Sequence, residues 1–197
     1  GITGEWHDLD WLTMHIQQGE DVTVEDVTNE RGILAVTGPR ARDVLAQLTD
    51  ADLGNAGFRW LTGQEITVAG APCIALRVSY VGELGWELHL PMEHMVGVYE
   101  AIQAAGAEHG IVDFGSRAMG IMRLEKAYKA FGSELTTEIT PIEARLERFV
   151  DWDKEFEGKE ATVARRDQTD PLSMVLVYAE LDDAGADCLG KIGRAHV

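Results

Sequence analysis

Two stretches of the sequence carry the side chains that could meet a ligand. The first, 78–91, places acidic residues in and just after a glycine turn, with Glu87 following Trp86. The second, 115–141, carries Arg117. A carboxylate accepts hydrogen bonds from the N–H groups of a ligand, and a guanidinium offers a rigid fork of donors. We therefore expect the two stretches to form one binding site, although a solvated surface position is the ordinary role of a residue such as Glu87.

Strands with one apolar face have to position the first stretch. Residues 65–68 and 72–80 predict a hairpin around Gly70-Ala71, and 86–90 predicts a further strand after a tight turn at 82–85. In these strands the predicted apolar face holds Ile74, Leu76, Val78 and Tyr80, then Trp86, Leu88 and Leu90. Because polar residues alternate with them, we expect an antiparallel sheet covered on one side, with Glu87 on the polar side.

A helix from Phe114 to about Tyr128, capped by Asp113, has to position the second stretch. Its predicted apolar arc consists of Phe114, Ala118, Ile121, Met122, Leu124 and Tyr128, and both Arg117 and Glu125 project inside it. Arg123 and Lys126 fall outside the arc, on the expected solvated side. Burying a charge costs several kcal/mol unless it is paired. Arg117 therefore predicts either a ligand site or a structural ion-pair network, and the pattern leaves both open.

The rest of the chain predicts alternating short elements. Strands are expected at 21–28, 32–36 and 172–181, helices at 39–49, 93–105 and 159–166, a helix or loop at 6–16, and an extended connector at 133–158. The predicted fold class is α+β, with antiparallel sheets and helices packed on one face.

Composition excludes several classes of function. The chain has 197 residues, 45% of them hydrophobic, and a net charge of −17, which disfavours direct binding to nucleic acid or to an anionic membrane. It has neither a long apolar run nor a signal peptide, so a cytoplasmic location is expected. Cys73 and Cys188 are expected to be reduced thiols, and the histidines lack the spacing of metal ligands.

Both ends of the sequence indicate that it is a fragment of a longer protein. The chain starts at Gly1 without a methionine, and its last residues, 191–197, form a basic tail that differs in composition from what precedes it. We expect this tail to be an artefact of sequencing and the gene to continue differently after Gly190.

The segment Ser79-Tyr80-Val81-Gly82-Glu83-Leu84-Gly85-Trp86-Glu87 resembles the strand–turn–strand signature of the folate-binding aminomethyltransferases, the family of the glycine cleavage T-protein. A second signature of that family is similar to Arg117, 122–126, 132–136 and 140–144, and a weaker third to 36–41. The amino-acid sequence of 126–128 and 156–161 is most similar to that of the C-terminal folate domains of sarcosine and dimethylglycine dehydrogenases. The likeness spans roughly 20–183.

This resemblance implies an aminomethyltransferase fold that binds tetrahydrofolate and accepts a one-carbon unit from an amine-derived donor. By position, Glu87 corresponds to the glutamate that holds the pterin ring and Arg117 to a folate-contacting arginine, while Tyr80 and Trp86 could line the cavity or pack the core. The family's catalytic aspartate belongs to a segment preceding Gly1, so no catalytic residue is assigned. No metal ligand is assigned either, because the histidines lack the spacing of metal ligands. The implied division is a partial folate domain at 1–150, a connector at 151–170, a truncated start of a C-terminal β-barrel domain at 171–190 and the tail at 191–197.

Three functions remain open at this point. The first is the folate domain of an FAD-linked dehydrogenase of sarcosine or dimethylglycine, with the flavin on a separate upstream domain. The second is a stand-alone aminomethyltransferase or a related folate-dependent demethylase. The third is a non-catalytic folate-binding module. We expect the fragment to be inactive alone.

Overall fold

The structure is a computed structural model that describes residues 4–168, 173–177 and 182. The chain divides into two compact units, Gly1–Lys126 and Ala127–Val197. The elements of the first unit are α1 Glu5–Met14, β1 Arg31–Thr37, α2 Ala41–Leu45, β2 Gly63–Val68, β3 Ala71–Leu76, β4 Gly85–Pro91, η1 Met92–His94, α3 Met95–Gly106, η2 Ala107–His109 and α4 Ser116–Glu125. The second unit contains η3 Glu147–Phe149 and α5 Lys159–Arg166.

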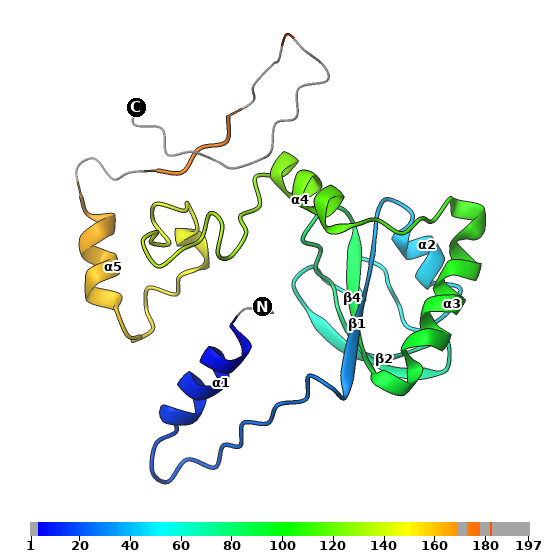
Figure 1. The fold of residues 1–197 in the computed structure, drawn as a ribbon, viewed down its shortest axis with the longest axis horizontal. Helices are drawn as coiled ribbons and strands as arrows, with labels where there is room; N and C mark the ends of the chain where they lie inside the picture. Colours follow the sequence, from blue (N-terminus) through cyan, green and yellow to red (C-terminus); the bar gives the residue numbers. More distant parts are fainter. Residues whose placement is uncertain (1–3, 169–172, 178–181, 183–197) are drawn as a thin grey trace. The chain divides into compact units, whose positions relative to one another are not determined.

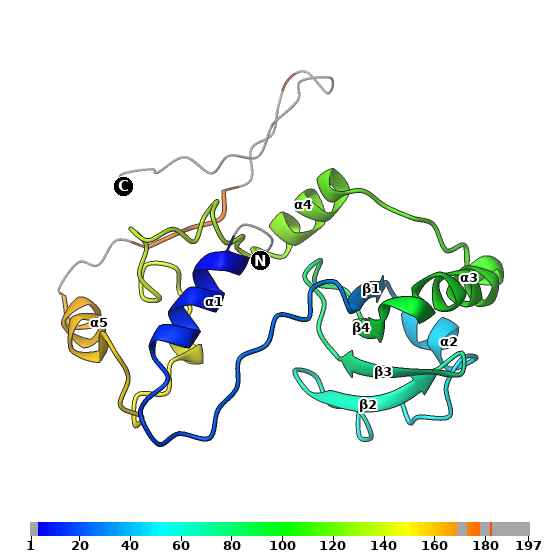
Figure 2. The same cartoon turned by 60° about the horizontal axis from the view of Figure 1, so that its bottom comes forward.

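The first unit is built on a four-stranded antiparallel sheet in the order β1-β4-β3-β2, which Figure 2 shows in this sequence. The predicted hairpin is confirmed, since β2 and β3 pair from Gly63↔Leu76 to Val68↔Ala71. Strand β4 runs between β1 and β3, which hydrogen-bond to it on either side. The expected α+β class with antiparallel strands is therefore confirmed.

The core lies between one face of this sheet and helices α2 and α3, which are neighbours in Figure 1. The large side chains of β4 fill it, because Trp86 is 1% exposed and Leu88 and Leu90 are fully buried. Fully burying an apolar side chain of this size contributes about 1.5–3 kcal/mol. Other core members are Val36, Val44, Leu45, Leu53, Phe58, Val68, Val98 and Ile102.

Strand β3 faces the opposite way from the prediction. Its buried residues are Ala71, Cys73 and Ala75, whereas Ile74 is 37% exposed. The register gives the reason, since Ala75 pairs with Leu88 and Ile74 with His89, and residues paired across an antiparallel ladder share a face. Once Leu88 is in the core, Ala75 must be there too. The strand also ends at Leu76 rather than at Tyr80, so an irregular loop, residues 77–84, replaces the expected tight turn.

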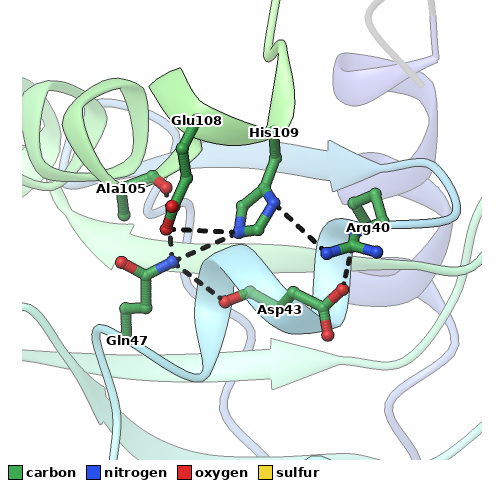
Figure 3. Close-up of polar contacts among 6 residues, drawn as sticks. All are labelled: Arg40, Asp43, Gln47, Ala105, Glu108 and His109. Carbon is green, nitrogen blue, oxygen red and sulfur yellow. Dashed lines mark hydrogen bonds and ion pairs between the residues drawn. The ribbon is translucent and has the colours of Figure 1, made fainter.

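A polar network fastens α2 to the C-terminal end of α3 (Figure 3). The amide nitrogen of Gln47 donates to the carbonyls of Asp43 and Ala105, at 3.3 Å each, and lies 3.4 Å from Nε2 of His109. On the other edge of the His109 ring, Nδ1 lies 3.5 Å from the Arg40 guanidinium, which also pairs with Asp43 at 2.7 Å. These contacts hold the two helices that cover the core in a fixed relation to each other.

The remaining predicted elements agree in part. The strand at 32–36 and the helices at 93–105 and 159–166 are confirmed, and 6–16 is largely the helix α1. The helix at 39–49 is reduced to α2. The strand predicted at 21–28 is absent, because this segment has no paired neighbour and Asp26 instead accepts the Thr28 N–H in a local turn.

Residues 133–158 form turns with one short helix, as expected of the connector. Of the strand predicted at 172–181, residues 173–177 carry no regular structure and the others lie outside the described residues, as does the tail at 191–197. None of the helices in the described ranges has the length and apolar character needed to cross a membrane. The cytoplasmic location stays a prediction.

Candidate functional site

Glu87 lies at the centre of the sheet, on the face opposite the core. Its register partners are Ala35 on β1 and Leu76 on β3, both with side chains on the same outer face. One residue along, Trp86 pairs with Val36 and turns into the core. The predicted alternation on β4 is thereby confirmed. Because β4 is hydrogen-bonded on both sides, the backbone of Glu87 is held more rigidly than a loop residue would be.

The Glu87 carboxylate has hydrogen-bonding capacity that the described residues leave unused. Its side chain is 34% exposed, and no residue in the described ranges donates a hydrogen bond to it. The nearest ionisable partner is His89, whose Nε2 lies 3.8 Å from Oε2 of Glu87 and is buried without a hydrogen-bond partner. Apolar side chains border this pair, because Ile33 and Ile74, both register partners of His89, are 54% and 37% exposed. The outer face thus combines a carboxylate that accepts no hydrogen bond from the described residues with exposed apolar side chains beside it.

Residues 77–84 form a loop at the edge of the sheet and are tied to the end of β1. The hydroxyl of Thr37 lies 3.1 Å from that of Ser79, and the carbonyl of Leu84 accepts the Gly38 N–H at 2.8 Å. Gly82 has a φ of 76°, a left-handed conformation that favours glycine. Tyr80, expected at the site, lies in this loop with 37% of its surface exposed.

The same loop meets the end of α4. Nζ of Lys126 lies 3.3 Å from Oε1 of Glu83, and a side chain at Gly82 would collide with the methylenes of Lys126. The structure therefore brings the first signature into contact with Lys126, a residue within the second signature. This contact was missed at the sequence level, because Lys126 falls on the helix face that the pattern assigned to solvent.

Helix α4 buries a different face from the one predicted. Arg123, expected on the solvated side, is 7% exposed, whereas Ile121 of the predicted apolar arc is 60% exposed. Arg117 and Glu125 are both exposed as well, so neither is a charge buried in an apolar arc. The helix is shorter than expected, Ser116–Glu125, and both aromatic ends of the arc, Phe114 and Tyr128, lie outside it.

The start of α4 also differs from the prediction. Gly115 rather than Asp113 is the N-terminal capping residue, and no side chain caps the helix. Asp113 is engaged elsewhere, because its carboxylate accepts hydrogen bonds from the Tyr99 hydroxyl at 2.7 Å and the Gln103 amide at 3.0 Å. The hydrogen bond to Asp113 raises the pKa of the Tyr99 phenol. These bonds fasten the segment before α4 to α3.

Of the four predicted site residues, Glu87 lies on the central strand β4 and Tyr80 in the loop that precedes this strand. Trp86 is enclosed in the core, where its ring meets that of Phe58 edge-on at 6.2 Å between centroids. No hydrogen bond or ion pair joins Arg117 to Glu87 within the described part of the chain. A groove of about 1180 Å³ exists elsewhere, along β2 and β3 beside Thr49, Asp52 and Glu65, and none of the four predicted residues lines it.

The sequence analysis also missed a buried acid in the second unit. Glu143 is 6% exposed and accepts hydrogen bonds from the backbone N–H and the hydroxyl of Thr140, at 2.9 and 3.1 Å. The Thr140-x-x-Glu143 spacing is that of a capping box, a signal readable from the sequence. Here the box closes a turn, because no helix follows it.

Similarity to known proteins covers most of the chain. It is 44% identical to the mitochondrial dimethylglycine dehydrogenase of Homo sapiens over 164 residues, which are 82% of this chain and 19% of that protein. It is 35% identical to the aminomethyltransferase of Thermoanaerobacter sp. (strain X514) over 177 residues, 89% of this chain and 47% of that one. The chain thus spans less than half the length of either relative.

A solved structure, the heterotetrameric sarcosine oxidase of Corynebacterium sp. U-96 in complex with pyrrole 2-carboxylate, covers 54% of this chain and 53% of its own, with a TM-score of 0.47 and 23% identity. The family model described as "GCVT N-terminal domain" matches residues 2–154. This match agrees with the resemblance carried by the two signatures, and the chain belongs to the GCVT N-terminal domain family of folate-binding aminomethyltransferases.

Proposed function

We propose that this chain is the tetrahydrofolate-binding part of a protein that transfers a one-carbon unit from a demethylated amine of the dimethylglycine or sarcosine type. The observation that carries the proposal is the position of Glu87. Its side chain, 34% exposed, stands on the outer face of the sheet, and the carboxylate accepts no hydrogen bond from the described residues.

The donor set of a pterin fits this carboxylate. A pterin presents a ring N–H beside an amino group, and an ionised carboxylate accepts two such hydrogen bonds side by side. The flat ring has apolar faces, which the neighbouring Ile33 and Ile74 could cover. In this proposal Tyr80 lies at the rim and Arg117 supplies a donor to the folate, while Trp86 fixes the strand from the core side.

Tetrahydrofolate would supply the acceptor for the one-carbon unit and leave as methylenetetrahydrofolate. The residues of this chain would bind and orient it, and we assign none of them a chemical step. The 44% identity to a dimethylglycine dehydrogenase favours a whole protein in which FAD on another domain oxidises the amine. The 35% identity to an aminomethyltransferase over 89% of the chain supports the second candidate, a stand-alone aminomethyltransferase.

Isothermal titration calorimetry with tetrahydrofolate tests the binding. We expect Glu87→Gln, and separately Arg117→Ala, to weaken affinity by about 1–3 kcal/mol, the usual cost of leaving a buried polar partner unpaired. Glu65→Gln is the matched control, because Glu65 pairs with Ile74 on the same outer face but lies on the edge strand β2. Binding that is unchanged by both substitutions would contradict the proposed site. A flavin absorption spectrum of the full-length protein would favour the dehydrogenase over the stand-alone enzyme.

A further inference from the structure

Two arginines converge on one asparagine on the core side of the sheet. Nη2 of Arg42 and Nη2 of Arg77 each lie 2.8 Å from Oδ1 of Asn55, to which both donate. Arg42 comes from α2, Arg77 directly follows β3, and Asn55 belongs to the loop between α2 and β2. Three segments distant in the sequence therefore bring two positive charges to a single neutral oxygen.

Both guanidinium groups are held in place by further contacts. Arg42 donates from Nε to the carbonyl of Leu53 at 2.9 Å, and Arg77 donates from Nη1 to the carbonyl of Phe58. Each group also lies over the ring of Trp86, with its central carbon 6.0 Å (Arg42) or 5.7 Å (Arg77) from the centroid. A guanidinium stacked on a buried indole and anchored to backbone carbonyls keeps its remaining donors in a fixed direction.

The pair has no counter-charge in the described part of the chain. No ion pair joins Arg42 or Arg77 to an acid there, although the chain has 34 acidic and only 17 basic residues. Asp52, one of the two acids of the same loop, is engaged locally, because its Oδ1 accepts the Gly54 N–H at 2.8 Å. Burial and, secondarily, the charge of Arg42 lower the pKa of the Arg77 guanidinium. Two cations at close quarters repel each other, and an anion between them would reverse this cost.

We propose that Arg42 and Arg77 form a binding site for a small oxyanion, a phosphate or carboxylate group. A guanidinium has five N–H donors, and the contacts above occupy two on each arginine. Both side chains are half-buried, so the remaining donors are accessible while partly shielded from water. Paired guanidiniums suit phosphate and carboxylate groups because the parallel N–H bonds match the spacing of their oxygens.

This site is separate from the proposed folate face. Arg42 and Arg77 stack on Trp86, which faces the core, whereas Glu87 faces the other side of the same strand. The inference therefore does not depend on folate binding, and either can fail without the other.

Thermal unfolding of the protein in inorganic phosphate and in glutarate, each against sodium chloride of equal ionic strength, tests the site and separates the two ligand classes. We expect one of the anions to raise Tm saturably, by about 3–6 °C at roughly tenfold excess over Kd. The anion that gives the tighter midpoint identifies the class. No rise beyond that in chloride, for either anion, would overturn the proposal.

Variants make the test specific. Arg42→Gln and Arg77→Gln should weaken the anion response at least about tenfold. Asn55→Asp should raise Tm without any anion and abolish the response, because the new carboxylate neutralises both guanidiniums from within. Arg59→Gln is the matched control, since it removes an exposed positive charge from the same loop and should leave the response intact. An anion response that persists in Asn55→Asp, or that is lost equally in Arg59→Gln, would refute the site.

Discussion

The Glu143 carboxylate accepts a hydrogen bond from the guanidinium of Arg165, which lies 22 residues further along the chain. Its other oxygen accepts from Thr140, and its backbone carbonyl accepts the Met174 N–H at 2.7 Å. One buried acid thus joins a turn, helix α5 and the segment 173–177. The second unit contains few regular elements, so these bonds fix its local arrangement.

Replacing Glu143 should loosen this arrangement. We expect Glu143→Gln to lower the free energy of unfolding by about 1–3 kcal/mol, because an amide cannot satisfy Thr140 and Arg165 together as a carboxylate does. Urea unfolding measures the loss, and amide hydrogen exchange should show faster exchange in α5. Glu147→Gln, at an exposed acid on η3, is the control and should change neither. Equal stability of the two variants would show that the Glu143 bonds contribute nothing net.

The same carboxylate should make the free energy of unfolding depend on pH. The hydrogen bond from the Thr140 backbone, followed by those from Arg165 and the Thr140 hydroxyl, lowers the pKa of Glu143 below its ordinary value of 4.5. Because the folded protein then binds this proton less tightly than the unfolded chain, the contribution is complete above pH 4.5 and is lost as pH falls through the lower, folded value. Urea midpoints from neutral to acid pH should converge for the wild type and Glu143→Gln. A constant gap across this range would contradict the assignment.

Cys73 should be chemically inert in the folded state. Burial raises the pKa of its thiol to about 11, so only about one molecule in a thousand is a thiolate at pH 8. In a Cys188→Ser variant, where Cys73 is the only thiol, Ellman's reagent should react slowly without denaturant and release one equivalent in guanidinium chloride. Fast labelling of the native protein would place Cys73 at an accessible position instead.

Gly82 should not tolerate a side chain. Its left-handed φ disfavours other residues, and an added Cβ would collide with Lys126. We expect Gly82→Ala to lower stability by about 1–2 kcal/mol and to displace the loop from the end of α4. Gly97→Ala is the matched control, because Gly97 lies in α3 with open space around its Cβ position and should gain about 0.5–1 kcal/mol. Differential scanning calorimetry compares the two, and a neutral Gly82→Ala would contradict this role.

The sequence pattern predicted β4 correctly because its buried residues are large and its outer ones polar. It failed on β3, where Cys73 and Ala75 face the core and Ile74 faces out. Small residues there share one core cluster with the large side chains of Trp86 and Phe58, and size complementarity across strands cannot be read from one strand alone. The side that β3 buries follows from its register with β4, which is a property of the folded sheet.

Helix α4 shows a second limit of prediction from sequence periodicity. The apolar arc that singled out Arg117 depended on a helix reaching Phe114 and Tyr128, yet Gly115 is extended and Ala127 has a φ of 59°, so the helix is bounded on both sides. Sequence periodicity does not report such backbone turns. The side of the sheet that Glu87 faces was predicted correctly, because it follows from the alternation of residues along one strand. The predicted partnership of Arg117 with Glu87 requires tertiary contacts and stays a prediction.

Because Trp86 and Glu87 alternate, β4 turns its packing residues to one face of the sheet and its outer-face residues to the other. In the proposed folate site, substitutions on the outer face, at Ala35, Leu76 or His89, would change the ligand contacts, whereas the packing residues lie on the other face of the sheet. For protein engineering, the outer face of β4 and its two neighbours is the place to vary residues, while any insertion or deletion within β4 would exchange its outer-face and core residues at once.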